Sequence, residues 1–242
     1  MLGVACAAFM AGTALAGPPY LTDDPQPTDE GHWEIYNFVD GLRNVGGLAG
    51  EAGVDLNYGA AKDLQLTAVL PLAYANENGF SQKGLQAGTG VIELAAKYKI
   101  MHADDQSWAP DVSVFPRIFV PTDSRFDTGH VALLLPVWIE KDWGPWQVFG
   151  GGGYQINPGA DERNFWQGGI AVNRVINKRL QLGVEIFGQT RDAIEDPGFT
   201  TVNFAATVKL VEHWSFLASI GPTWEQGGAM GQVFYLSLKA DY

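Results

Sequence analysis

The chain is poor in charge, in basic side chains and in cysteine. Charged residues make up 17% of its 242 residues, whereas soluble domains usually carry about 25%. Its 15 Lys and Arg against 27 Asp and Glu give a net charge of −12. A surface that binds nucleic acid needs the opposite sign, so we expect no nucleic acid partner.

Cysteine and long apolar runs are confined to the first residues. The one cysteine, Cys6, lies in the uncharged segment 1–16, which ends Ala14-Leu15-Ala16. Small residues at the end of an apolar stretch are typical of a signal-peptidase site, so we predict a signal peptide over residues 1–16. No later segment offers the roughly 18 apolar residues of a membrane helix. An exported chain of this kind enters a membrane only as a closed barrel.

Alternation of apolar and polar residues dominates the rest of the chain. At the C-terminus, Phe234, Leu236, Leu238 and Tyr242 alternate with polar residues such as Lys239. A barrel strand that faces lipid needs such an apolar face backed by a polar one. The terminal aromatic residue also resembles the recognition signal of the outer-membrane assembly machinery, so these four apolar residues are our candidate assembly signal.

The same pattern predicts about twelve strands of about 9–11 residues, long enough to cross a bilayer at a tilt. They are His32–Gly41, Leu48–Tyr58, Leu64–Leu72, Val91–Ile100, Asp111–Val120, His130–Glu140, Trp146–Gln155, Phe165–Arg174, Leu180–Gln189, Thr201–Leu210, Trp214–Pro222 and Val233–Tyr242. Short connections alternate with longer polar loops such as Ala75–Gly88, as inside turns alternate with outside loops in bacterial barrels. Met101–Pro110 and Leu42–Gly47 depart from this rule.

We therefore predict an all-β fold: a single closed antiparallel transmembrane β-barrel of about twelve strands, an up-and-down meander over residues 32–242. We expect it in the bacterial outer membrane. A soluble periplasmic β-sandwich is the alternative, because abundant glycine and aromatic residues also suit a sandwich core.

Charges of both signs fall on the face opposite the apolar one, which would line the barrel interior. They can fill and brace the interior through salt bridges, or they can line a polar path. Glu93 and Arg117 lie on adjacent predicted strands, so a paired role is plausible for them. The candidate residues are Glu51, Asp55, Glu93, Lys97, Arg117, Glu185, Lys209 and Lys239.

Residues 17–31 precede the first predicted strand and contain four prolines. Proline at this density excludes a regular helix or a central strand, so we predict an extended segment. It either enters the barrel mouth as a plug or stays outside as a linker. The candidate plug residues are Leu21, Thr22, Asp23, Asp24 and Pro25.

This segment also carries a family resemblance. Gly17–Asp29, followed by Gly31-His32-Trp33-Glu34, resembles the opening of the meta-pathway of phenol degradation family. The resemblance implies an outer-membrane barrel that serves as a transporter, and by family association a role in the uptake of hydrophobic or aromatic compounds.

Motifs that carry chemistry are missing from the sequence. The four histidines are scattered, and Gly150–Gly153 lacks the lysine of a phosphate-binding loop and reads as a close-packed barrel strand. We expect no enzyme, no cofactor and no metal. The leading hypothesis is a passive channel for small, hydrophobic or aromatic solutes; the alternative is a non-transporting structural, adhesive or sensing barrel. The expected partners are outer-membrane lipid, the assembly machinery and a small-molecule solute.

Overall fold

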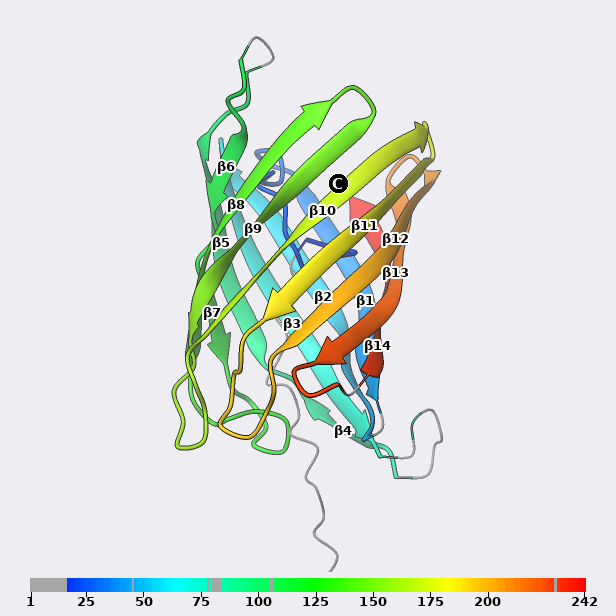
Figure 1. The fold of residues 1–242 in the computed structure, drawn as a ribbon. Helices are drawn as coiled ribbons and strands as arrows, with labels where there is room; N and C mark the ends of the chain where they lie inside the picture. The colour runs from blue at the N-terminus through cyan, green and yellow to red at the C-terminus, as the bar shows by residue number, and fades with distance from the viewer. Residues whose placement is uncertain (1–16, 45, 78, 80–83, 105–106, 229) are drawn as a thin grey trace, which may run out of the picture.

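Antiparallel strands close into one barrel in the computed structural model, which describes residues 17–44, 46–77, 79, 84–104, 107–228 and 230–242 (Figure 1). Strands that are neighbours along the chain pair with one another, except β4 with β5 and β6 with β7, and β14 pairs back with β1, which closes the barrel. The strands are β1 (Trp33–Asn44), β2 (Gly47–Ala61), β3 (Leu64–Asn76), β4 (Gln86–Thr89), β5 (Ile92–Met101), β6 (Asp111–Val114), β7 (Arg117–Val120), β8 (Ala132–Trp143), β9 (Trp146–Ile156), β10 (Phe165–Asn177), β11 (Leu180–Gln189), β12 (Phe199–Val211), β13 (Trp214–Glu225) and β14 (Met230–Asp241). The predicted signal peptide lies outside the described residues.

Two of the barrel walls are interrupted strands. β4 and β5 both pair with β3, and Gly90-Val91 lies between them. β6 and β7 both pair with β5 and β8, and they are separated at Phe115-Pro116. Pro116 has no N–H to give to the ladder. β4 and β5 together fill one strand position around the barrel, and β6 and β7 fill another. The fourteen strands therefore form twelve walls, each one strand position wide, which confirms the predicted fold.

Two details of the strand prediction are wrong. The single strand expected over Asp111–Val120 is broken at its centre, because of Pro116. The loop expected over Ala75–Gly88 is shorter, because β3 runs on to Asn76 and β4 forms. Gly150–Gly153 lies within β9, as expected for a close-packed strand: a Cβ on Gly153 would stand 2.5 Å from the carbonyl oxygen of Leu135.

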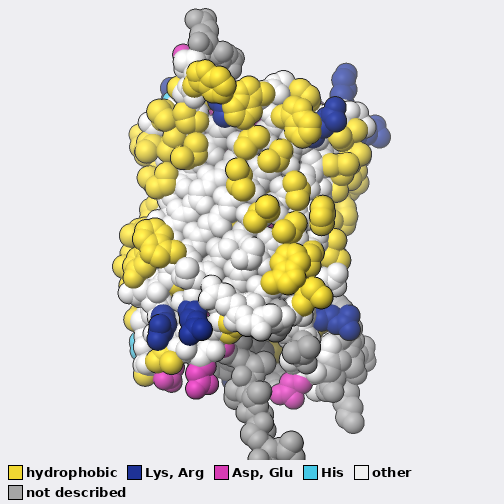
Figure 2. Space-filling model, in the orientation of Figure 1, with side chains coloured by type: hydrophobic (Ala, Val, Ile, Leu, Met, Phe, Trp, Pro, Cys, Tyr) yellow, Lys and Arg dark blue, Asp and Glu magenta, His cyan; other side chains and the backbone are white. Residues whose placement is uncertain are grey.

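The outer surface of the barrel is apolar between its two ends. Outward side chains such as Leu70, Ile186 and Phe204 are 49%, 54% and 60% exposed. On the face drawn in Figure 2, hydrophobic side chains are spread over the side of the barrel between uncharged white surface, and Lys, Arg, Asp and Glu lie near the two ends. A closed barrel with this exterior is an outer-membrane protein.

The two ends of the barrel differ in their connections. Short turns at 62–63, 144–145, 178–179 and 212–213 share one end with the hydrogen bond from Trp33 N to Tyr242 O, 2.8 Å. Longer loops at 77–85, 121–131, 157–164 and 190–198 lie at the other end. By the rule for bacterial barrels, the long loops face outside, and the two ends are called the turn end and the loop end below. Among the described residues, no helix is long and apolar enough to cross a membrane.

A charge placed in the middle of the apolar exterior should be costly. Val137 lies midway along β8 and is 42% exposed, whereas Val211 ends β12 and is 62% exposed. We expect Val137→Arg to lower the free energy of unfolding from vesicles by about 2–4 kcal/mol, and Val211→Arg by about 0–1 kcal/mol. Urea titration of the two variants in phospholipid vesicles measures both values. Equal losses would contradict the assignment of this surface to lipid.

Candidate functional site: the occupied lumen

Residues 17–30 run inside the barrel and contact walls on opposite sides of it (Figure 1, dark blue). The segment joins the wall at the turn end, where Gly31 N donates to Gly59 O at 2.8 Å. Thr22 and Asp23 are 0% and 3% exposed. Proline at four of these positions removes backbone donors that would otherwise need partners in a confined space.

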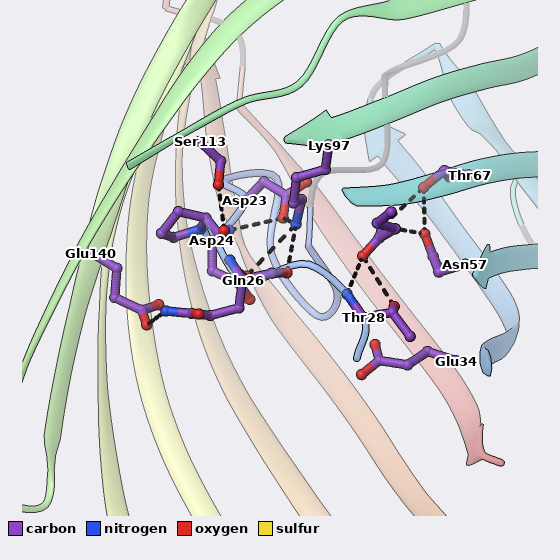
Figure 3. A network of polar contacts seen from close by, with 12 residues as sticks. Asp23, Asp24, Gln26, Thr28, Glu34, Asn57, Thr67, Lys97, Ser113 and Glu140 are labelled. Carbon is purple, nitrogen blue, oxygen red and sulfur yellow. Dashed lines mark hydrogen bonds and ion pairs between the residues drawn. The ribbon is translucent and has the colours of Figure 1, made fainter. Parts of the chain in front are cut away.

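A buried ion pair ties the segment to β5. Lys97 Nζ stands 2.9 Å from Asp23 Oδ1 and 3.6 Å from Asp24 Oδ1 (Figure 3). The side chains of Lys97 and Asp23 are only 5% and 4% exposed. Lys97 Nζ also donates to the carbonyl oxygen of Gln26 at 3.4 Å. A pair this far from water depends on both partners, because either charge alone would be left buried without compensation.

Gln26 spreads the attachment over three further inward side chains. Its Nε2 donates to Glu140 Oε1 at 2.6 Å and to Asp111 Oδ2 at 3.0 Å. Its Oε1 accepts from Lys99 Nζ at 2.5 Å. Ser113 Oγ donates to the carbonyl oxygen of Pro25 beside it. The segment is therefore bound to β5, β6 and β8 through side chains of both charge signs.

The opposite wall holds the segment through Glu185 on β11. The backbone N–H groups of Leu21 and Thr22 both donate to its carboxylate, the first at 3.2 Å. Asn203 Nδ2 donates to the same carboxylate at 2.7 Å. Glu185 is 0% exposed. Its negative charge is met by three donors rather than by a cation, which is how a buried carboxylate is satisfied without an ion pair.

Uncharged side chains complete the attachment. Tyr20 Oη donates to Asn173 Oδ1 on β10, and Ser219 Oγ on β13 donates to the carbonyl oxygen of Pro19 at 2.6 Å. On β3, Gln65 Oε1 accepts from Thr28 N at 2.8 Å and from Thr28 Oγ1 at 3.0 Å (Figure 3). Walls on all sides of the lumen thus bind one short segment.

A second buried ion pair crosses from β5 to β7. Arg117 Nε stands 2.7 Å from Glu93 Oε1, and the two side chains are 2% and 4% exposed. The ring of Phe115 lies between the two cations of this region, with its centroid 5.0 Å from Arg117 Cζ and 4.9 Å from Lys97 Nζ. This pair braces the wall in which β6 and β7 are interrupted.

The other predicted lumen residues are more dispersed. Asp55 accepts from Asn57 Nδ2 at 2.8 Å, and Glu51 is half-buried near the loop end. Lys239 pairs with Glu34 at 3.0 Å and Asp241 at 2.9 Å at the turn end. Lys209 is exposed near the end of β12 and makes no ion pair within the described part of the chain.

Several wall residues that bind the segment were not among the predicted lumen residues. Four of them are uncharged, whereas the predicted set held only charged side chains: Gln65, Ser113, Asn173 and Ser219. Three charged residues that bind Gln26 were missed as well: Lys99, Asp111 and Glu140. Their positions in the alternating pattern were a usable signal for the wall residues, because each falls on the face opposite the apolar one.

Three residues of the candidate assembly signal lie on β14, next to β1, and Tyr242 directly follows this strand. Leu236, Leu238 and Tyr242 are 41%, 38% and 58% exposed on the outer surface, and Phe234 is half-buried. Among the described residues, no three His, Cys, Asp or Glu side chains are grouped so that they could hold a metal ion.

Two outer loops, 157–164 and 190–198, are joined by hydrogen bonds to backbone carbonyl oxygens and carry acidic side chains beside these bonds. Asn157 Nδ2 donates to Glu162 Oε2 at 2.9 Å, and Arg163 N donates to Asp192 O at 2.7 Å. Burial raises the pKa of Glu162 and the pKa of Asp192 above their ordinary values, and neighbouring carboxylates, Asp196 among them, add to both shifts. Ionisation of the two groups therefore opposes the pairing of the loops.

This pairing should tighten as the pH falls. A raised carboxyl pKa gives stability that is complete below the ordinary value, about 4, and is lost as the pH rises through the raised value. We expect the amides of Arg163 and Ile194 to exchange more slowly at pH 4 than at pH 8, after correction for the intrinsic rate. Hydrogen-exchange mass spectrometry measures this, with β9 peptides as the control. Faster corrected exchange at pH 4 would contradict the sign.

Known proteins resemble the chain in fold. No family model matches it, and no curated protein matches it either. A COG4313 outer membrane channel from Pseudomonas putida F1 matches with a TM-score of 0.64 at 14% identity, covering 89% of this chain and 96% of that one. The translocator domain of the autotransporter NalP from Neisseria meningitidis matches with a TM-score of 0.51 at 10% identity, covering 86% and 87%. At these identities the likeness supports the fold, and the resemblance to the meta-pathway family stays a prediction.

Proposed function

We propose that the protein is a passive outer-membrane channel for small solutes, closed at rest by its own N-terminal segment, with Leu21–Pro25 as the plug. The observation that carries this proposal is the segment inside the lumen, bound by Lys97 on one wall and Glu185 on the other. These contacts are polar and non-covalent, so water and ions can replace them. The similar fold of a protein described as an outer membrane channel supports the proposal.

Release of the segment does not require the barrel to open. The ladder from β1 to β14 is closed by strand pairing alone, without residues 17–29. An open fraction of about 1% corresponds to a docking free energy of about 2.7 kcal/mol. A gate of this kind needs contacts strong enough to hold the segment and weak enough to release it.

The lining near the loop end favours small aromatic or hydrophobic solutes. Phe119, Phe165, Phe187 and Phe199 point inward there and are buried, and the rings of Phe187 and Phe199 are 6.1 Å apart. Aromatic faces bind planar apolar molecules. The acidic excess of the chain disfavours anionic solutes. The family resemblance of residues 17–34 agrees with this solute class.

A solute series tests the proposal. Benzyl alcohol and an uncharged sugar are compared as permeants across an asymmetric bilayer with lipopolysaccharide in one leaflet, with and without the protein. We expect the protein to increase the permeation rate of benzyl alcohol more than that of the sugar. No acceleration of either solute, even when the segment is released, would instead favour a non-transporting barrel, which the filled lumen also fits.

The exterior suggests the remaining partners. We propose outer-membrane lipid as the partner of the apolar belt and the assembly machinery as the partner of β14. No step of the proposed function needs a catalytic side chain or a cofactor.

A further inference from the structure

Three basic side chains gather at one corner of the turn end, called the basic corner below. Arg174 lies near the end of β10, and Lys178 and Arg179 form the turn that joins β10 to β11. All three are exposed, and none of them makes an ion pair with any described residue. Lys and Arg side chains gather at the upper right of Figure 2, over the ends of β10 and β11. Although the chain has a net charge of −12, this corner is therefore positive.

Arg174 points to the lipid side of the wall. Along β10, Trp166 and Ile170 are 63% and 52% exposed on the outer surface, and the adjacent Asn173 is buried. Arg174 follows Ile170 at the even spacing of one strand face. Its Cζ lies 5.0 Å from the centroid of the Trp146 ring on β9. An indole attracts a guanidinium through its ring face and prefers the boundary between lipid and water, so this pair marks the depth of that boundary.

The turn beyond Arg174 reaches the depth of the lipid headgroups. Three residues separate Arg174 from Lys178, which is about 10 Å along a strand and less along the membrane normal, because barrel strands tilt. The headgroup layer is about 5–8 Å thick on each side of a bilayer. The three cations therefore span the layer in which lipid phosphates lie. The neighbouring turns along this rim hold one acid, Glu212 at 212–213, and none at 144–145.

We propose that the basic corner binds the headgroup of an anionic phospholipid in the periplasmic leaflet. A guanidinium can pair with phosphate through two parallel hydrogen bonds, and Lys178 adds a point charge. The acyl chains would lie on the apolar exterior of β10 and β11, where Leu182 stands opposite Arg174 and is 43% exposed. A zwitterionic headgroup carries its own cation, which the three basic side chains repel. The inference names a lipid class for the lipid partner proposed above, and it does not depend on whether the barrel conducts.

The test uses phosphatidylglycerol as the anionic probe and phosphatidylcholine, with the same acyl chains, as its zwitterionic counterpart. Each lipid is titrated into the intact protein in detergent micelles, and native mass spectrometry counts the lipids that stay bound and gives an apparent Kd. The variants are Arg174→Gln alone and Arg174→Gln combined with Lys178→Gln and Arg179→Gln. Lys62→Gln is the matched control, because Lys62 is an exposed cation in another turn at the same end and makes no ion pair among the described residues. Heat-modifiable migration on gels shows that each variant is folded.

We expect the unmodified protein to prefer phosphatidylglycerol, and added salt to weaken that preference by screening. A basic side chain beside an anionic headgroup strengthens binding by about fivefold, so Arg174→Gln should bind phosphatidylglycerol about fivefold more weakly. By the same principle the triple variant should lose about tenfold or more, and Lys62→Gln should lose nothing.

Equal affinity of the unmodified protein for the two lipids, or unchanged affinity for phosphatidylglycerol in the triple variant, would overturn the proposal. A loss in Lys62→Gln as large as that in Arg174→Gln would also overturn it, because any exposed cation would then serve. A barrel that conducts but has no lipid preference overturns the lipid site alone. One that prefers phosphatidylglycerol at the basic corner but never conducts overturns the channel alone.

Discussion

Replacing Lys97 with methionine is expected to raise the open-to-closed ratio of the barrel in planar bilayers by about 100-fold or more. Removal of one partner from a buried ion pair costs about 3–5 kcal/mol, and each 1.4 kcal/mol is about a factor of ten in an equilibrium. The cost falls on the docked state, because Asp23 regains water when the segment leaves the lumen. Single-channel recording of the variant beside the unmodified protein measures the open fraction.

Lys209→Met is the matched control for this prediction. It removes the same charge from the same predicted lumen face, but Lys209 is exposed and makes no ion pair within the described residues. We expect its open fraction to equal that of the unmodified protein. If Lys97→Met and Lys209→Met behave alike, the ion pair with Asp23 does not hold the channel closed.

Arg117→Met should weaken the barrel itself. Glu93 would be left as a buried charge without its cation, so we expect the free energy of unfolding to fall by about 3–5 kcal/mol. The exposed pair of Arg125 with Asp123 provides the comparison, since the Arg125 side chain is 59% exposed. Arg125→Met should leave the free energy of unfolding nearly unchanged, because water screens an exposed pair. Urea titrations in vesicles measure both.

A double variant separates the ion pair from simple loss of packing. Glu93→Leu combined with Arg117→Met replaces both charges with apolar side chains, which is often neutral for a buried pair. We expect the double variant to recover most of the stability that Arg117→Met loses. A double variant as unstable as Arg117→Met alone would show that packing of the arginine, and not the unpaired carboxylate, sets the cost.

The barrel could be predicted from the sequence because lipid favours apolar side chains and the lumen favours polar ones, so the two kinds alternate along each strand. The strand predicted over Leu180–Gln189 has the same ends in the structure, and the C-terminal strand was also found. The strand over Asp111–Val120 was misread because a single proline interrupts the ladder without disturbing the alternation. A four-residue strand such as β4 is too short to show a pattern.

The candidate site was less predictable, because its contacts join residues far apart in the chain. Asp23 and Lys97 are 74 residues apart, and Thr22 and Glu185 are 163 apart. Alternation shows that Lys97 and Glu185 face inward, but it does not say what meets them there. The prolines and acids of residues 17–31 fitted a plug and a linker equally well. The choice of partner depends on the register and closure of all twelve walls.

The most direct test of the central claim removes the segment. Conductance of single barrels is compared between the unmodified protein and a variant without residues 17–29, with heat-modifiable migration as the check that the variant is folded. The account predicts stable open steps in the deletion variant, and closure when a synthetic peptide of residues 17–29 is added at the turn end. A scrambled peptide should have no effect. A folded deletion variant with conductance as low as that of the unmodified protein would contradict the account.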